Sequence, residues 1–167
     1  MREPLLHVVL DRPKIAGNIG AVARLCAVTG AALHACGPFP FVDRDLKHLR
    51  RAGLDYWPFV RAHFHRDVHA CLALLGRAPF VVEKGGARSP FEVSLTRGDV
   101  VVLGPEDGSV DERVTQAHRD RVLTLPMRPG VRSLNLAQCA SVVVYEAVRQ
   151  QGGVCPLDDD TQPEGAA

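Results

Sequence analysis

The sequence predicts an α/β fold with a mostly parallel sheet and helices on both faces of that sheet. Segments of strand character alternate with segments of helix character over most of the 167 residues, the order expected of parallel strands joined by helices. Strands such as DVVVL, at residues 99–103, are continuously apolar, which is typical of strands buried on both faces. Glycines follow several helical patterns and indicate where those helices end.

Six short apolar segments bounded by turn residues are predicted to be the strands. In chain order they are residues 5–10, 31–36, 59–63, 79–83, 99–103 and 121–125. The chain has no internal repeat, and its length suits one domain with one sizeable core. We therefore expect these strands to share a single sheet.

Five segments with helical spacing of apolar residues separate or follow these strands. They are residues 18–28, 43–52, 65–75, 111–119 and 135–150. Asn18 and Asp43 are expected to be N-caps, and Gly30 and Gly76 are expected to follow helix ends. Arg24 lies opposite the apolar arc of the first helix, so periodicity alone places it in solvent.

The last predicted helix is apolar nearly all round. Between residues 136 and 148 its apolar side chains cover most directions of a helical wheel. Such a helix must be buried on more than one side. One side can face the sheet, and in a chain of this size the other is expected to face a second copy, which predicts a homodimer. The alternative is burial within a single subunit.

Composition indicates one folded domain, residues 1–151, followed by an acidic tail at 152–167 that is expected to be disordered. The tail carries four acidic residues and no Lys or Arg, so the rest of the chain holds 20 basic against 15 acidic residues. This mild basic bias permits a nucleic-acid partner without requiring one. No signal-peptide pattern and no membrane-length apolar run is present, which predicts a cytoplasmic protein without a membrane partner.

The cysteines predict neither a disulfide framework nor a metal site. The five cysteines are Cys26, Cys36, Cys71, Cys139 and Cys155. They are widely spaced, with no C-x-x-C pair and no His/Cys cluster at zinc spacing. The expectation is buried free thiols in a reducing compartment and no bound metal.

Three glycine-containing polar loops follow predicted strands. They are KGGARS at 84–89, GPEDGS at 104–109 and PMRPGVRSLN at 126–135. In an open parallel sheet, ligands bind beyond the carboxyl ends of the strands, and glycines let the backbone approach a ligand closely. Each loop alone is an ordinary turn, but together the three predict a pocket for a small molecule or nucleotide.

Residues 44–66 form the basic stretch of the chain, with aromatic residues interleaved. Arginines beside exposed aromatic rings suit phosphate contacts and base stacking on single-stranded RNA. Arg50, Arg51, Tyr56 and Trp57 are the predicted RNA contacts. The alternative is a solvated helix face followed by aromatic residues of the core.

Four segments together resemble the SpoU-type RNA 2′-O-methyltransferases of the SPOUT superfamily. They are NIGAVARLCAVTGA, VVLGPEDGS, LPMRPGVRSLNLAQCASVVVYEAVRQ and, for the TrmL type that methylates the tRNA wobble ribose, DLKHLRRAGLDYW. The resemblance runs from Leu5 to about Gln150. The chain departs from the usual second motif at Ser109 and Val110, where the family has glycine and leucine, and has Gly17 where proline is common.

The resemblance implies a deep trefoil knot near the C-terminus, S-adenosylmethionine as methyl donor, a homodimer, and the tRNA anticodon stem-loop as partner. The implied catalytic residues are Asn18, Arg24, Glu106, Ser133 and Asn135. The implied cofactor-binding residues are Val81, Leu103, Gly104, Leu125, Met127, Ser133 and Leu134. A guanidinium is a poor general base. In this assignment Arg24 therefore binds the RNA phosphate next to the target ribose and polarises the 2′-hydroxyl of that ribose.

Three alternatives to a wobble-position enzyme remain open at this level. One is 2′-O-methylation of another tRNA or ribosomal position. A second is an RNA-binding module that keeps the pocket but has lost catalysis, which the altered second motif supports. A third is a generic nucleotide-binding α/β domain, although the full G-x-G-x-x-G fingerprint is absent.

Overall fold

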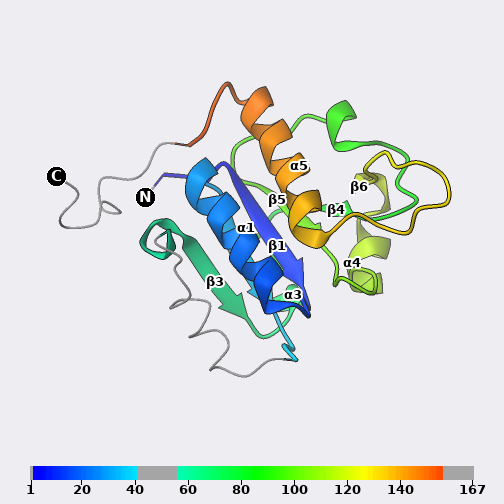
Figure 1. The fold of residues 1–167 in the computed structure, drawn as a ribbon, viewed down its shortest axis with the longest axis horizontal. Coiled ribbons are helices and arrows are strands. Elements are labelled where there is room, and N and C mark those ends of the chain that lie inside the picture. The colour runs from blue at the N-terminus through cyan, green and yellow to red at the C-terminus, as the bar shows by residue number, and fades with distance from the viewer. Residues whose placement is uncertain (1, 41–55, 156–167) are drawn as a thin grey trace.

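Six parallel strands form one sheet in the order β3-β2-β1-β5-β4-β6 (Figure 1). The computed structural model describes residues 2–40 and 56–155. The strands are β1 Leu6–Asp11, β2 Ala32–Cys36, β3 Arg61–His65, β4 Phe80–Val82, β5 Asp99–Leu103 and β6 Val122–Leu123. The predicted parallel α/β class is confirmed, and the strand order switches direction between β1 and β5.

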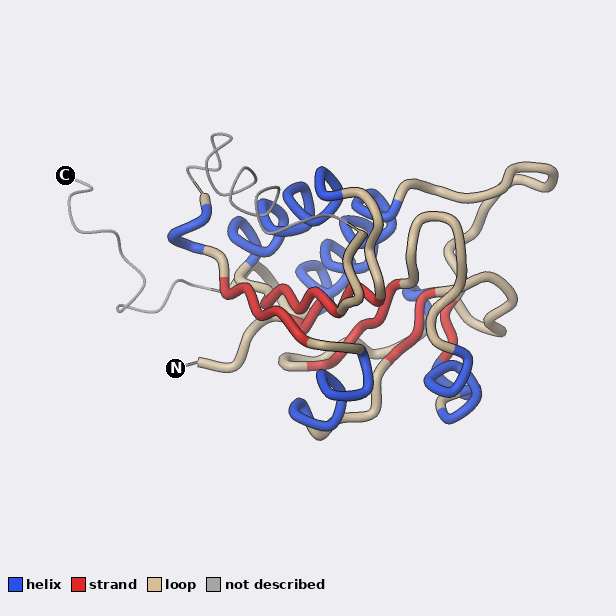
Figure 2. The backbone as a smooth tube through the Cα atoms, turned by 90° about the horizontal axis from the view of Figure 1, so that it is seen from below, coloured by secondary structure: helices blue, strands red, loops and turns tan. Residues whose placement is uncertain are grey.

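Helices cover both faces of the sheet, as Figure 2 shows. The helices are α1 Ala16–Thr29, α3 Val68–Leu75, α4 Glu112–Ala117 and α5 Leu136–Gln150. Three short 3-10 turns accompany them, at Trp57–Phe59, Pro90–Glu92 and Arg119–Arg121. Helices α1 and α5 pack on one face and share its apolar core, while α3 and α4 contribute to a second core on the other face.

Two cores explain why the strands read as continuously apolar. In β1, Val8 and Leu10 belong to the core under α1 and α5, whereas Val9 belongs to the core under α3 and α4. Successive side chains of a strand point to opposite faces, so a sheet covered on both sides needs apolar residues at both.

The structure corrects several predicted boundaries. Helix α1 begins at Ala16 with Ile15 as its N-cap, so the prediction that Asn18 is the N-cap is wrong. The strand predicted to begin at Phe59 begins at Arg61, because residues 57–59 form a 3-10 turn instead. The helix predicted at 43–52 lies outside the described residues.

Within the described ranges, no helix is long and apolar enough to cross a membrane.

Gly30 ends α1 in the left-handed region, with φ of 75°. Cys155, inside the span predicted as tail, is buried against it, and the Cys155 N–H donates to the Thr29 carbonyl at 2.9 Å. A Cβ at position 30 would lie 2.5 Å from both the Cβ and the carbonyl oxygen of Cys155. Glycine is therefore required there for conformation and for space.

We expect Gly30→Ala to lower the free energy of unfolding by about 2–4 kcal/mol, because it adds a steric clash to left-handed strain. Gly76 is a matched control, since it ends α3 with φ of 63° but has nothing within 4 Å of its would-be Cβ. Gly76→Ala should cost only about 1–2 kcal/mol. Urea denaturation measures both, and equal losses would contradict the assigned role of Cys155.

Candidate active site

The three glycine-containing loops meet around one cavity of about 620 Å³. It lies beyond the carboxyl ends of β4, β5 and β6, where ligands bind in sheets of this type. Of the predicted cofactor-binding residues, six line the cavity. They are Leu103, Gly104, Leu125, Met127, Ser133 and Leu134. Its wall mixes apolar side chains with backbone polar groups, as the sequence predicts for a nucleotide-sized ligand.

Val81 does not line this cavity. Its side chain is fully buried in the core under α3 and α4, and the neighbouring Val82 lines the cavity instead. One residue along a strand reverses the face, so the side chain of Val82 rather than that of Val81 forms this part of the wall. The assignment of Val81 to the cofactor site stays a prediction. Glu83, Lys84 and Thr124 also line the cavity and were missed. Thr124, a polar residue within the apolar VLTL run, was the available signal.

Thr124 joins two of the loops. Its hydroxyl donates to the Glu83 carbonyl at 2.6 Å and accepts from the Gly86 N–H at 2.6 Å. Gly86 is packed so closely on β6 that a Cβ would lie 2.5 Å from the Val122 carbonyl oxygen. The glycine-containing loop at 84–89 is thus fixed against the sheet, which gives the cavity one rigid wall.

Gly104 forms the opposite wall, directly after β5. A Cβ there would lie 2.7 Å from the backbone nitrogen of Val110. The turn at 104–110 therefore closes tightly on itself, and Val110 is buried in the α3 and α4 core. The departures from the family pattern at Ser109 and Val110 are accommodated within a compact turn that still presents Gly104 and Glu106 to the cavity.

Glu106 holds the start of α1. Its carboxylate accepts hydrogen bonds from the Lys14 N–H at 2.7 Å, the Ile15 N–H at 3.0 Å and the Asn18 Nδ2 at 2.8 Å. Burial pushes the pKa of Glu106 upward, but the bonds from Asn18, Lys14 and Ile15 outweigh it and lower that pKa below its usual range. Glu106 is therefore a carboxylate at neutral pH, placed to position rather than to donate a proton.

Asn18 lies at the centre of a polar bridge, defined here as Glu106, Asn18 and Asn135. Asn18 is 7% exposed, and its side chain donates to Glu106 and accepts from Asn135 Nδ2 at 3.1 Å. The Asn135 Oδ1 in turn accepts from the N–H groups of Ala137 and Gln138, so Asn135 is the N-cap of α5. Three of the five predicted catalytic residues are thus bonded in series.

Ser133 and Arg24 stand apart from this bridge. Ser133 is exposed and lines the cavity, while Asn135 makes the contact with Asn18. Arg24 is exposed on α1, does not line the cavity of its own chain, and lies over the Tyr56 ring, 4.5 Å from its centroid. The expectation that Arg24 is surface-exposed holds, with an aromatic partner that periodicity could not reveal.

The predicted RNA contacts are only partly described. Arg50 and Arg51 lie outside the described residues. Tyr56 is half-buried beneath Arg24, and Trp57 is half-buried against the core shared by α1 and α5. Trp57 therefore fits the alternative of a core aromatic residue, whereas Tyr56 and Arg24 present one cationic and aromatic surface.

The parallel sheet and its loop-lined cavity define an α/β nucleotide-binding or cofactor-binding protein. Residues 5–145 match the SpoU rRNA Methylase family. A tRNA (cytidine(34)-2'-O)-methyltransferase of Methylovorus glucosotrophus is 41% identical over 151 residues, covering 87% of this chain and 96% of the relative. The chain belongs to the SpoU methylase family.

Two solved structures share this fold and bear on the cavity. One, addressing 2-OH methylation of C/U34 on tRNA, is 41% identical with a TM-score of 0.78, covering 88% of this chain and 96% of its own. The other is the SpoU methyltransferase AviRb of Streptomyces viridochromogenes in complex with the cofactor AdoMet. It is 26% identical with a TM-score of 0.72, and covers 90% of this chain and 62% of its own.

Proposed function

We propose that this chain is a tRNA 2′-O-methyltransferase that uses S-adenosylmethionine and modifies the ribose of nucleotide 34 in the anticodon stem-loop. The observation that carries the proposal is a cavity lined by Glu106, which the Glu106–Asn18–Asn135 bridge ties to the starts of α1 and α5. It occurs in a chain 41% identical to a relative named for cytidine 34 methylation. The proposed location is the cytoplasm, where tRNA is available.

The cavity fits S-adenosylmethionine by size and by wall chemistry. Its volume of about 620 Å³ is in the range of small-molecule sites. The tight turn at Gly104 brings backbone to the wall, and Leu125 and Met127 offer apolar surface for an adenine ring. These residues, with Leu103, Ser133 and Leu134, would hold the cofactor. When bound, it supplies a methyl group on a positively charged sulfonium.

The chain's own residues then have to align the attacking hydroxyl. A ribose 2′-oxygen displaces a neutral thioether, so no anion accumulates on the substrate, and orientation contributes up to about 7–11 kcal/mol in favourable cases. The bridge joins Glu106 to the first turn of α1 and, through Asn18, joins α1 to the start of α5. Ser133 faces the cavity. The proposed role of Arg24 is to bind the phosphate next to that ribose and polarise its hydroxyl.

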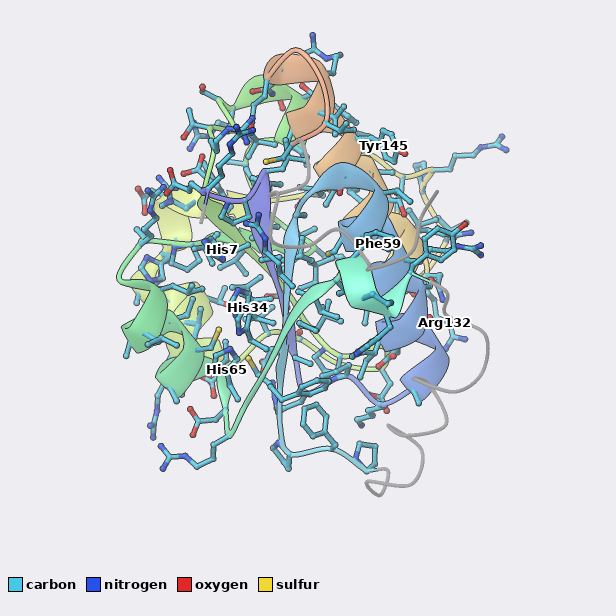
Figure 3. The ribbon with its side chains drawn as sticks, turned by 90° about the vertical axis from the view of Figure 1, so that its left-hand side faces the viewer. His7, His34, Phe59, His65, Arg132 and Tyr145 are labelled. Atoms are coloured by element: carbon cyan, nitrogen blue, oxygen red, sulfur yellow. The ribbon has the colours of Figure 1, made fainter. Side chains whose placement is uncertain are left out.

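We propose that the enzyme is a homodimer in which Arg24 serves the cavity of the partner subunit. Arg24 does not line the cavity of its own chain. Exposed apolar side chains occur at the start of α1, on α5 and in the loop between β6 and α5, and include Ile15, Tyr145 and Val131. Figure 3 shows Tyr145 and Arg132 on the side of the molecule away from His7, His34 and His65. This apolar side supports the interface predicted for α5.

The trefoil knot is likewise proposed. The segment after β4 bonds β6 from both sides, since the Glu83 N–H donates to the Leu123 carbonyl and the Thr124 N–H donates to the Arg88 carbonyl. The chain then leaves β6 through residues 126–135 and returns as α5 over the other part of the sheet, as Figure 1 shows. This path supports threading of the C-terminal segment through the loop that follows β4.

Incubation of the purified chain with labelled S-adenosylmethionine and bulk tRNA tests the proposed activity. We expect label on tRNA, and mapping of the methylated nucleotide is expected to place it on the ribose of nucleotide 34. Label at another tRNA position would replace the target but keep the enzyme class. Binding of tRNA without transfer would favour a module that has lost catalysis.

We expect the double variant Arg50→Gln/Arg51→Gln to weaken tRNA binding and to reduce the slope of log K against log salt by about 2 units. Each arginine that contacts a phosphate releases about one counterion, so removing two flattens the salt dependence. Binding titrations at several salt concentrations measure the slope. Arg113→Gln/Arg119→Gln, which changes one exposed arginine of α4 and one of the 3-10 turn after it, is the charge-matched control. An unchanged slope in the first variant would move the RNA surface elsewhere.

A further inference from the structure

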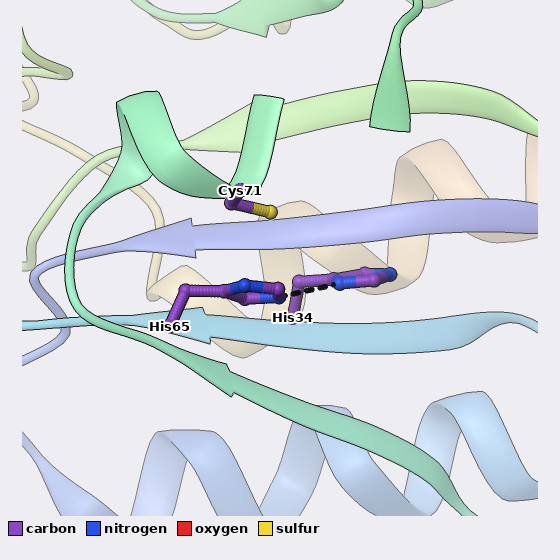
Figure 4. Close-up of side chains that lie close together, drawn as sticks. All are labelled: His34, His65 and Cys71. Atoms are coloured by element: carbon purple, nitrogen blue, oxygen red, sulfur yellow. Dashed lines mark hydrogen bonds between the residues drawn. The ribbon is translucent and has the colours of Figure 1, made fainter. Parts of the chain in front are cut away.

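A cluster of imidazoles and thiols lies on the α3 face of the sheet, where no residue of the cofactor cavity is involved. His34 comes from β2, His65 from the end of β3 and Cys71 from α3. One ligand atom from each of these three residues lies within 4.8 Å of the other two. Figure 4 shows both imidazoles side by side beneath the helix, with Cys71 above them.

The strand register explains how residues so far apart in the sequence come together. Cys36 lies directly opposite His65 in the parallel pair of β2 and β3, and His34 lies two residues before Cys36 on the same face. Cys71 then packs down from α3 into the same core as Cys36. Sequence spacing alone hid this cluster because its members come from three elements joined only in the folded sheet.

Burial makes this cluster unlike a set of surface histidines. His34 is 3% exposed and Cys71 and Cys36 are 0% exposed, while His65 is half-buried at the edge. Histidine binds a metal ion as a neutral imidazole, through the lone pair of one ring nitrogen.

The distances suit a tetrahedral ion after a small adjustment. His34 Nδ1 and His65 Nε2 are 2.9 Å apart. Two nitrogens bound to one tetrahedral zinc at about 2.0–2.1 Å are about 3.3 Å apart. The two rings therefore need to separate by only a few tenths of an ångström, and His65, at the exposed edge, has room to move.

The other nitrogen of His34 has a fixed partner. His34 Nε2 lies 2.9 Å from His7 Nδ1. If His34 gives its Nδ1 lone pair to a metal ion, its Nε2–H donates to His7, which fixes the tautomer and the ring orientation. Metal-bound histidines usually have such an acceptor behind them. Figure 3 shows His7, His34 and His65 in sequence along this side of the molecule.

We infer that His34, His65 and Cys71 bind a zinc-class divalent ion, which leaves the fourth position of the tetrahedron open. Imidazole nitrogens and a thiolate are ligands that zinc prefers. Because a cysteine binds zinc as its thiolate, the ion would bind with release of the Cys71 thiol proton. It would join β2, β3 and α3 at the sheet edge, as a structural site independent of methyl transfer.

The test uses the full chain, reduced with a phosphine, stripped with a chelator and titrated with Co²⁺ and then Zn²⁺. We expect one Co²⁺ per chain, with the intense visible bands of a tetrahedral site and a near-ultraviolet thiolate-to-cobalt band. Zn²⁺ should displace the Co²⁺ and raise the melting temperature by several degrees. Absence of both bands, or of any zinc-dependent shift in melting, would leave a hydrogen-bonded chain of imidazoles and overturn the inference.

Variants assign the ligands. Cys71→Ser and His65→Asn should each weaken binding at least about 10²-fold, and Cys71→Ser should also remove the thiolate band. The half-exposed His65 keeps the test decisive if Cys71→Ser does not fold, as judged by melting in chelator. His69→Asn, exposed on α3, and Cys26→Ala, a buried thiol on the other sheet face, are the matched controls. Equal loss in the controls would contradict the assigned ligands.

Discussion

The Arg24→Ala variant is expected to lose methyl transfer by about 10²–10⁴-fold while its affinity for S-adenosylmethionine stays within about twofold of the parent chain. Arg24 is exposed, contacts the Tyr56 ring and does not line the cofactor cavity of its own chain. Its removal therefore takes away a contact to substrate but no part of the cofactor wall. Isothermal titration measures cofactor binding, and transfer of labelled methyl to tRNA measures activity.

Arg113→Ala, an exposed arginine of α4 on the opposite face of the sheet, is the matched control and should keep both properties. Arg24→Lys is informative as well, because an ammonium keeps the charge but loses the planar fork of donors. We expect it to remain well below the parent activity. Equal loss of cofactor binding and of transfer in Arg24→Ala would make Arg24 a structural residue.

The same variant tests whether Arg24 serves the partner's cavity. Met127→Arg places a bulky cation in the cavity wall and should abolish cofactor binding in its own subunit. Neither Arg24→Ala nor Met127→Arg should be active alone. Mixed dimers of the two should recover activity if Arg24 acts across the interface, because one of their two sites is then intact. No recovery in verified mixed dimers would place Arg24 and the cavity in the same subunit.

The second large effect is expected for Glu106→Ala, which should lower the free energy of unfolding by about 3 kcal/mol. It removes the acceptor of three hydrogen bonds at the start of α1 and leaves the buried amide of Asn18 without its carboxylate. Activity should fall further than stability alone explains, because Asn18 and α1 lose their fixed positions. Urea denaturation, with activity measured where the variant is fully folded, separates the two effects.

Asp107→Ala is the control for this prediction. Asp107 is the neighbouring carboxylate, but it forms only an exposed ion pair with Lys14, with 65% of its side chain accessible. Its loss should cost no more than about 1 kcal/mol. Similar losses for the two variants would contradict the positioning role of Glu106.

Acid should reproduce part of the Glu106→Ala effect. Hydrogen bonds lower the pKa of Glu106 in the folded chain. The contribution of Glu106 to the free energy of unfolding is therefore complete above the pKa that Glu106 has in the unfolded state. That contribution disappears as the pH falls through the lower, folded value. The Ala variant should therefore lose this part of the acid dependence, which denaturation curves across the acidic range reveal.

Much of the fold could be predicted because its strands are buried on both faces. Strand β5 was predicted with its observed bounds, and α5 differs by one residue, since Asn135 is its cap. The start of α1 was mispredicted because its N-terminal groups are satisfied by Glu106, from a turn about 90 residues away in the chain. No local pattern contains that partner. The capping preference of asparagine pointed to the wrong residue.

The cavity could be predicted from glycine loops at strand ends, but the side chains that line it depended on strand phase. Val82 was not identified as a lining residue, because periodicity fixes neither the end of a strand nor its face when both faces are apolar. The His34, His65 and Cys71 cluster was invisible to spacing rules, since it forms only through the pairing of β2 with β3 and the packing of α3. Long-range register, rather than local propensity, decides such sites.

The Glu106–Asn18–Asn135 bridge joins groups 117 residues apart in the chain. During synthesis, α1 leaves the ribosome long before Asn135 does, so Asn18 stays without this amide until the chain is nearly complete. Contacts of such long range form late in folding. A nascent chain therefore has no finished cofactor cavity, and binding of S-adenosylmethionine reports completion of the whole fold. Ligand-dependent protection from proteolysis should accordingly appear only once α5 has been made and released.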